Sequence, residues 1–169
     1  MSKPVFVGYA TRYGSTAEVA QKIASVLEKS GHVVEIKSLR EVDDLDGYDA
    51  VVMGAPLFMY KWHRDAKRFL TSNRKALKKL PVAIFALGPT HDPHDEKEWQ
   101  ESTGHLKKEL EKFPWLKPVA VEMFGGKWAP EKLKAPLRWL AGKEPATDIR
   151  DWEAIRSWAN ALPEKWRFF

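Results

Sequence analysis

The chain has 169 residues, a length that fits a single domain over residues 1–169 with a sizeable core. Hydrophobic residues make up 44% and charged residues 30%, which indicates a soluble globular protein rather than a disordered one, and 28 Lys and Arg against 23 Asp and Glu give a net charge of +5. The absence of cysteine excludes disulfides, thiolate metal sites, iron–sulfur clusters and thiol nucleophiles.

The first half of the chain alternates runs of strand length with one clear helical pattern. Its predicted elements, in chain order, are a strand at residues 5–10, a helix at 15–30, a strand at 32–38 and a strand at 50–55. Residues 15–18 fit a capping box at the start of the helix, and Gly31 suits its end. The last of these strands is apolar without alternation, as expected for a strand buried on both faces.

The second half continues the alternation and adds a long connection. Its predicted elements, in chain order, are a helix at about 64–79, a strand at 81–87, a helix at about 95–113 capped by Asp95, a strand at 119–124 and a last helix that starts near Asp151 and is halted by Pro163. The connection, from residue 125 to about 150, precedes the last helix.

Five strands that alternate with helices imply parallel pairing through right-handed crossovers, and therefore a three-layer α/β sandwich with helices on both faces of the sheet. The strand count suits a doubly wound sheet in the order 2-1-3-4-5, the order of which flavodoxin is the known example. Ligands of such sheets lie beyond the carboxyl ends of the strands, at the switch point.

The turn after the first strand, residues 11–16, leads directly into a helix start. Unpaired amides, the positive end of the helix dipole and hydroxyl side chains together make an anion site. A P-loop is excluded because Gly8 and Gly14 are too far apart and no Lys follows, and a dinucleotide fingerprint is excluded because Gly14 is the one glycine in the turn. Two interpretations stay open: Ser15 is the cap of an ordinary helix, or the turn binds a phosphomonoester.

The residues of this turn resemble the phosphate loop of flavodoxins, which bind FMN, through the pattern Thr11-x-x-Gly14-Ser15-Thr16. Gly54-Ala55-Pro56 and Gly88-Pro89-Thr90 are similar to the two loops that flank the flavin ring. Within the family, the chain most resembles the flavodoxin-domain menaquinone-dependent protoporphyrinogen dehydrogenases. That likeness rests on Thr11-Arg12-Tyr13-Gly14, an aromatic-x-x-His segment after Gly54-Ala55, and the long connection before Asp151-Trp152-Glu153.

The resemblance implies a set of FMN contacts. The phosphate would be held by Thr11, Arg12, Tyr13, Gly14, Ser15 and Thr16. One wall of the ring site would be formed by Pro56, Leu57, Phe58, Met59, Tyr60, Lys61 and Trp62, with Tyr60 or Trp62 in ring contact, and the other by Gly88, Pro89, Thr90, His91 and Asp92. Two departures from that enzyme group, Phe58 in place of an arginine and the sequence of residues 88–95, concern the substrate rather than the cofactor.

His63 and residues 91–95 are further polar candidates for chemistry at this site. His63 starts a predicted helix, where the helix dipole lowers the pKa of the imidazole and favours its neutral form. His63 is therefore a candidate to donate a hydrogen bond to the flavin or to relay a proton. The alternative is that His63 is a solvated side chain. Residues 91–95 contain two imidazoles and two carboxylates, but the segment is short and interrupted by Pro93. We therefore expect a polar loop over the cofactor and no metal.

Basic residues concentrate around the helix at 64–79 and, interleaved with Trp128 and Trp139, in the connection at about 126–147. One interpretation is a solvated face and a loop packed on the sheet; the other is contact with an acidic redox partner or with a membrane surface. No nucleic-acid-binding module is present, and we expect no nucleic-acid partner. Without an apolar run of roughly 18 residues or a signal-peptide pattern, the expected location is cytoplasmic, with peripheral contact at the inner face of the membrane.

Three functional hypotheses follow. The first is an FMN-dependent oxidoreductase that passes electrons from an organic, tetrapyrrole-like substrate to a quinone. The second is a flavodoxin-type carrier that shuttles electrons between protein partners, and the third is a binding domain without redox activity. The basic charge favours the first, because flavodoxin carriers are acidic as a family and use that charge to steer toward basic partners.

Overall fold

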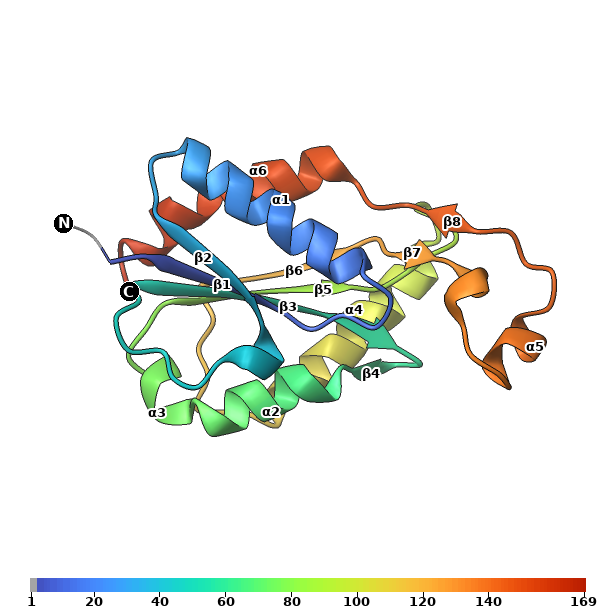
Figure 1. Cartoon of the computed structure of the whole chain (residues 1–169), viewed down its shortest axis with the longest axis horizontal. Helices are drawn as coiled ribbons and strands as arrows, with labels where there is room; N and C mark the ends of the chain where they lie inside the picture. Colours follow the sequence, from blue (N-terminus) through green and yellow to red (C-terminus); the bar gives the residue numbers. More distant parts are fainter. Residues whose placement is uncertain (1–2) are drawn as a thin grey trace.

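The computed structural model describes residues 3–169 as a central sheet between two layers of helices (Figure 1). Its parallel strands lie in the order β2-β1-β3-β5-β6, with bounds β1 Val5–Tyr9, β2 Val34–Ser38, β3 Ala50–Phe58, β5 Val82–Leu87 and β6 Ala120–Phe124. One face is covered by α1 Ser15–Lys29 and α6 Trp152–Trp166, and the other by α2 Arg64–Ser72, α3 Arg74–Leu77 and α4 Glu96–Glu111. The predicted three-layer α/β sandwich and its strand order are confirmed.

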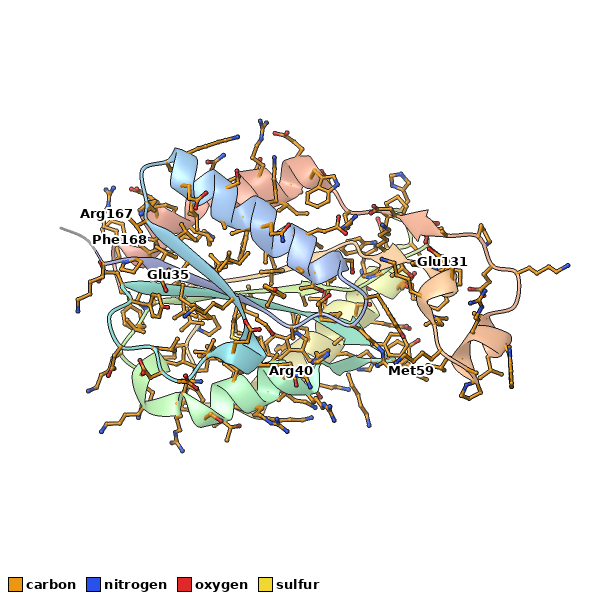
Figure 2. The ribbon with its side chains drawn as sticks, in the orientation of Figure 1. Glu35, Arg40, Met59, Glu131, Arg167 and Phe168 are labelled. Atoms are coloured by element: carbon orange, nitrogen blue, oxygen red, sulfur yellow. The ribbon has the colours of Figure 1, made fainter. Side chains whose placement is uncertain are left out.

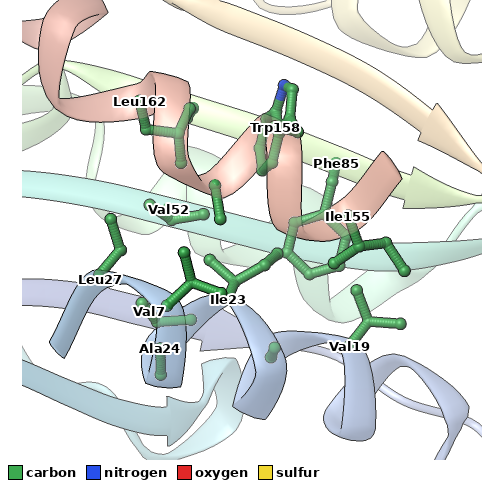
Figure 3. Packing of buried hydrophobic residues seen from close by; sticks show 14 of the residues in the cluster. Val7, Val19, Ile23, Ala24, Leu27, Val52, Phe85, Ile155, Trp158 and Leu162 are labelled. Carbon is green, nitrogen blue, oxygen red and sulfur yellow. The ribbon is translucent and has the colours of Figure 1, made fainter. Parts of the chain in front are cut away.

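Two apolar clusters, one on each face of the sheet, hold the layers together. In the first, Ile23 and Leu27 of α1 meet Ile155 and Leu162 of α6 over the central strands (Figure 3). Each of these side chains is completely buried, and burying a side chain of this size contributes roughly 1.5–3 kcal/mol. The residues of β5 are buried along its whole length, as its uniformly apolar sequence predicts.

Two predicted helix bounds are wrong. The helix expected at 64–79 divides at Asn73, whose side-chain amide and backbone amide both donate to the Phe69 carbonyl at 3.0 Å. A side chain that bonds its own backbone in this way is typical of a helix end. The last helix does not stop at Pro163 but continues to Trp166. Because Pro163 lies in the final turn, it removes one hydrogen bond near an end, while Leu162 and Trp166 pack on the core on either side of it.

Residues 56–62, expected as a loop, form a β-hairpin that extends the sheet. The strand β3 continues to Phe58, and β4 (Lys61–Trp62) pairs with it antiparallel, with Phe58 opposite Lys61. The two turn residues, Met59 and Tyr60, have φ values of 50° and 65°. Both therefore lie in the left-handed region that such two-residue hairpin turns require, where Asn and Gly are the favoured residues. The sequence Met-Tyr carries no turn signal, which is why the hairpin was not predicted.

The connection forms an arm, residues 125–150, beyond the carboxyl ends of the parallel strands (Figure 1). Within it, β7 (Lys127–Trp128) and β8 (Thr147–Asp148) form a two-stranded antiparallel sheet, and η2 (Pro130–Lys132) and α5 (Leu137–Ala141) lie between them. A further short helix, η1 (Leu39–Glu41), follows β2. Among residues 3–169, no helix has both the length and the apolar character to cross a membrane.

The hairpin turn gives a first prediction. Tyr60→Gly and Tyr60→Ala both remove the contact of the tyrosine ring with His105, but only glycine relieves the left-handed backbone at this position. We therefore expect the Gly variant to unfold at higher urea than the Ala variant, with a free energy of unfolding larger by about 1 kcal/mol. Equal midpoints for the two variants would show that the turn carries no strain at Tyr60.

Candidate functional site

The turn between β1 and α1 leaves the start of the helix open. The Gly14 amide donates to Thr11 Oγ1 at 2.8 Å, and Gly14 adopts a φ of 94°, so that α1 begins at Ser15 with no side chain capping it. The predicted capping box is therefore wrong, because the turn closes one residue earlier on Thr11. The first amides of α1 thus have neither an intrahelical nor a side-chain partner, which suits an anion.

Thr16 adds an unsatisfied hydroxyl at the same place. Its side chain is completely buried, and its Oγ1 has no hydrogen-bond partner among residues 3–169. Leaving such a group unpaired costs roughly 1–3 kcal/mol, so a ligand oxygen that satisfied it would be stabilised accordingly. The indole N–H of Trp128, from the arm, is also buried without a partner in the described part of the chain.

The arm closes over this turn. Lys132 Nζ donates to the Tyr13 carbonyl at 3.2 Å, and Ala129 and Leu133 are buried where they line a groove together with Ser15. The groove thus has a roof made of residues more than a hundred positions away in the sequence.

A buried arginine fixes the base of the arm to α1. Arg150 Nη1 donates to the Ser15 carbonyl at 3.2 Å, and Nη2 pairs with Asp148 at 2.7 Å. Its second carboxylate partner is Glu18, at 3.5 Å. The hydrogen bonds from Arg150 hold the pKa of Asp148 below its usual value, and those to Asp148 raise the pKa of Arg150, so both groups stay charged.

The hairpin forms one wall of the groove. The Arg12 guanidinium lies over the Phe58 ring at 4.3 Å from its centroid. The Tyr60 ring packs against His105 of α4 with centroids 4.6 Å apart and the ring planes tilted by 40°. Trp62 is placed differently from its neighbours: its ring is buried in the core, and its Nε1 donates to the Ala55 carbonyl at 3.2 Å. Trp62 therefore anchors the hairpin, while Phe58, Met59 and Tyr60 are its more accessible side chains.

The segment at residues 88–92 forms the opposite wall and is held by the arm. The Gly126 amide donates to the Pro89 carbonyl at 2.7 Å, and the Thr147 hydroxyl donates to the Thr90 carbonyl. The His91 ring packs near the Trp128 indole, with centroids 5.8 Å apart.

The side chains of His91, Asp92 and Asp95 form hydrogen bonds within the chain. His91 Nδ1 lies 2.9 Å from Thr90 Oγ1, and Asp92 Oδ1 accepts from the His94 amide at 2.8 Å. Asp95 accepts from the Glu98 amide at 3.1 Å and caps α4, as predicted.

Two adjoining hollows make up the groove. The first runs beside the turn at Tyr13 and Ser15, and the second, of about 330 Å³, lies between the hairpin and α4. They share lining from all three segments, namely Leu57, Phe58, Gly88, Thr90 and Trp128. An anion site at one end and a largely apolar slot at the other suit a ligand with a phosphate and a flat ring.

A family model described as "Flavodoxin domain" matches residues 6–138. The chain belongs to the flavodoxin domain family. Its sequence is 23% identical to the protoporphyrinogen IX dehydrogenase [quinone] of Escherichia coli over 91% of each chain. Among solved structures, it is similar to oxidised flavodoxin 2 from Bacillus cereus, with a TM-score of 0.58, 18% identity and coverage of 96% and 99% of the two chains. A flavodoxin from the domain Archaea has a TM-score of 0.58, 15% identity and coverage of 97% and 99%.

FMN is accordingly the cofactor of this flavodoxin domain, as the resemblance implied. The residues present fit it: the orphaned Thr16 hydroxyl and the open start of α1 match a phosphate, and the apolar slot matches a flavin ring. All three segments expected around the cofactor, residues 11–16, 56–62 and 88–92, meet at the carboxyl ends of the strands.

The sequence did not predict which arm residues line the groove of this flavodoxin domain. Ala129 and Leu133 are apolar residues without a motif, and Arg150 is one of many basic residues. The pair Gly125-Gly126 is the sequence feature that could have indicated this packing of the arm. A Cβ on Gly125 would lie 2.4 Å from the Ile149 carbonyl oxygen, and one on Gly126 would lie 3.1 Å from Thr90. The pair therefore marks the point at which the arm packs closely on its surroundings.

His63 lies outside the groove, behind the hairpin, as the N-cap of α2. Its Nδ1 accepts from the Asp65 amide at 3.1 Å, which places the ring proton on Nε2. Burial lowers the pKa of His63, and the nearby Arg12 and Arg64 lower it further, although Asp65 opposes them. The expected direction is correct, but burial is the largest cause.

The phosphate end of the groove gives a second prediction. Thr16→Val keeps the shape of the side chain and removes the unpaired hydroxyl. We expect the FMN-free variant to be at least as stable as the wild type and its Kd for FMN to rise about tenfold. Fluorescence titration with FMN measures this, with Thr71→Val, at an exposed position of α2, as the control that leaves the Kd unchanged. An unchanged Kd in Thr16→Val would remove this hydroxyl from the phosphate site.

The His63 cap gives a third prediction. Because the pKa of His63 is lowered in the fold, its contribution to stability is present above about pH 6.5 and is lost as the pH falls through the folded value. His63→Asn keeps a capping side chain and should flatten that acid-side loss in urea unfolding. His63→Ala should lose about 1 kcal/mol at pH 8 as well. Parallel pH profiles for the wild type and the Asn variant would contradict the assignment.

Proposed function

We propose that this flavodoxin domain is an FMN-dependent oxidoreductase that takes electrons from an organic, tetrapyrrole-like substrate and passes them to a quinone. The observation that carries the proposal is a cavity of about 560 Å³ that adjoins the groove and shares Arg12 and Phe58 with it. A carrier that exchanges electrons with proteins needs no second small-molecule site, whereas an enzyme does. The similarity to the quinone-linked dehydrogenase over 91% of both chains also supports an enzymatic function.

The chain's own residues would bind and orient the reactants. Residues 11–16 would hold the FMN phosphate, and the hairpin and residues 88–92 would form the two walls of the ring site. When bound, FMN supplies the centre that accepts and releases the electrons. In each turnover the substrate loses two electrons and two protons, and one quinone gains them and becomes a quinol. His63, whose Nε2 carries the ring proton, would donate a hydrogen bond at that atom to a ligand in the adjoining cavity.

The proposal is tested by turnover. Protoporphyrinogen IX, prepared by chemical reduction of protoporphyrin IX, is mixed anaerobically with the FMN-loaded protein and at least three equivalents of menadione, because three two-electron turnovers convert it to the porphyrin. The fluorescence of the product porphyrin is followed. We expect porphyrin to form only when protein, FMN and quinone are all present. If no porphyrin forms, but the protein is reduced by a flavodoxin reductase and passes electrons to cytochrome c, the protein is a carrier and the enzymatic proposal is wrong.

We also propose that the arm contacts an anionic membrane surface, where a lipid-soluble quinone is available. Trp139 and Leu140 on α5 are 78% and 81% exposed, and the exposed basic residues Lys134, Arg138 and Lys143 flank them in the sequence. Exposed Trp and Leu beside cationic side chains are the combination that favours the interface of anionic lipids. The arm extends away from the body of the domain, so these side chains can reach a flat surface (Figure 1).

This contact is tested by co-sedimentation with vesicles. We expect several-fold more protein on phosphatidylglycerol-containing vesicles than on phosphatidylcholine alone, and loss of that excess in the double variant Trp139→Ser with Leu140→Ser. Phe168→Ser is the matched control, because Phe168 is 81% exposed but lies at the opposite end of the molecule (Figure 2). Equal sedimentation with both vesicle types would contradict the membrane contact, and the arm would then only cover the groove.

A further inference from the structure

The cavity beside the groove differs from the groove in the residues that line it. It lies between the hairpin, the start of α2 and η1, with Leu137 of the arm at its border. Arg40 and Met59 mark two sides of this region (Figure 2). Its volume of about 560 Å³ is that of a site for an organic molecule rather than for a simple ion.

Cationic side chains outnumber acids in its lining, with Arg12, Arg40, Lys61 and Arg64 facing Asp65 as the one carboxylate. Asp65 is buried and already shared, since its oxygens lie 3.3 Å from Arg40 Nε and 3.9 Å from Arg64 Nε. Arg12 and Lys61 have no carboxylate within ion-pair distance in the part of the chain that the structure describes. Positive charge is therefore available in the cavity for a ligand.

These two cations are brought together by Phe58. Arg12 lies over the Phe58 ring at 4.3 Å from its centroid, and Lys61 is the partner of Phe58 across the hairpin. Directly opposed residues of an antiparallel pair present their side chains on the same face. An anionic group that reached Arg12 would therefore also be near Lys61, next to an aromatic surface.

The rest of the lining is apolar or a hydrogen-bond donor. Phe58, Leu137 and Met59, which is 71% exposed, offer carbon surface to a ligand. His63 contributes a neutral ring with its proton on Nε2, because Nδ1 is occupied by the Asp65 amide. An inorganic anion would use the cations and leave this apolar surface in water, whereas an amphipathic organic anion would use both.

We propose that this cavity binds the carboxylate-bearing end of a flat organic substrate, with Arg12 and Lys61 pairing its carboxylates and Phe58 and Leu137 covering its apolar part. The inference rests on the proposed function, because it places that substrate beside the ring site. Arg12 and Phe58 border both spaces, so a molecule held in this way would extend from the cavity toward the groove.

The test compares protoporphyrin IX with its dimethyl ester, which keeps the flat ring but has methyl esters in place of the two ionised carboxylates. Each is titrated into the FMN-loaded protein in detergent below its micelle concentration, and the shift of the porphyrin absorption band gives the Kd. We expect the diacid to bind about tenfold more tightly than the ester, with an advantage that shrinks as salt is raised.

Substitutions inside and outside the cavity test which side chains bind the carboxylates. Lys61→Gln should weaken binding of the diacid about fivefold and leave that of the ester unchanged. Lys75→Gln, an exposed lysine of α3 outside this cavity, should change neither. Arg12→Gln should also weaken diacid binding, and its Kd for FMN is measured separately because Arg12 borders the groove.

A failure of this inference can be distinguished from a failure of the proposed function. If diacid and ester bind equally, or if Lys61→Gln and Lys75→Gln behave alike, this cavity does not recognise carboxylates, and the proposed function stands as long as protoporphyrinogen is oxidised. If the diacid is preferred and Lys61→Gln abolishes the preference, but no porphyrinogen is oxidised, the cavity is an anion site and the proposed function is the part that fails.

Discussion

The groove depends on one buried cation. Arg150 ends the arm, and its guanidinium joins the Ser15 carbonyl in the first turn of α1 to the carboxylates of Asp148 and Glu18. Its side chain is 3% exposed, so losing both carboxylates would leave its charge buried without compensation, which is strongly destabilising. This cluster fixes the arm to the same helix turn that carries the anion site, and the position of the roof follows from it.

The arm in turn sets the geometry of the second wall. Hydrogen bonds from Gly126 and Thr147 reach the carbonyls of Pro89 and Thr90, and Lys132 reaches the carbonyl of Tyr13. Residues from four separate parts of the chain are thus held at the carboxyl edge of the sheet, where a doubly wound fold leaves its crevice. The orphaned hydroxyl of Thr16 and the indole N–H of Trp128 remain as polar groups for a ligand to satisfy.

The sheet could be predicted from the sequence because its strands carry a simple pattern. Residues 50–55 and 81–87 are uniformly apolar, which is the mark of strands buried on both faces, and the alternation with helices sets the parallel order. The segments that line the groove could also be predicted, from the position of the turn at residues 11–16 and from the family resemblance.

What could not be predicted depends on tertiary contacts. The hairpin turn uses Met59 and Tyr60 in a conformation that favours Asn and Gly, and it is held by the buried Trp62 rather than by its own sequence. Pro163 is accommodated because the residues around it pack on the core. The roof of the groove is formed by Ala129 and Leu133, whose importance lies in where Arg150 holds them and not in any local pattern.

The central claim is that FMN lies in a groove that the arm closes, and amide hydrogen exchange with and without FMN tests it most directly. We predict that FMN slows exchange at residues 12–16, in the hairpin, at residues 88–92 and in the arm at 126–133, while α3 on the far side is unchanged. FMN that binds and protects residues 12–16 but leaves residues 126–133 unprotected would contradict the claim that the arm covers the site. FMN that leaves residues 12–16 unprotected would contradict the location of the site itself.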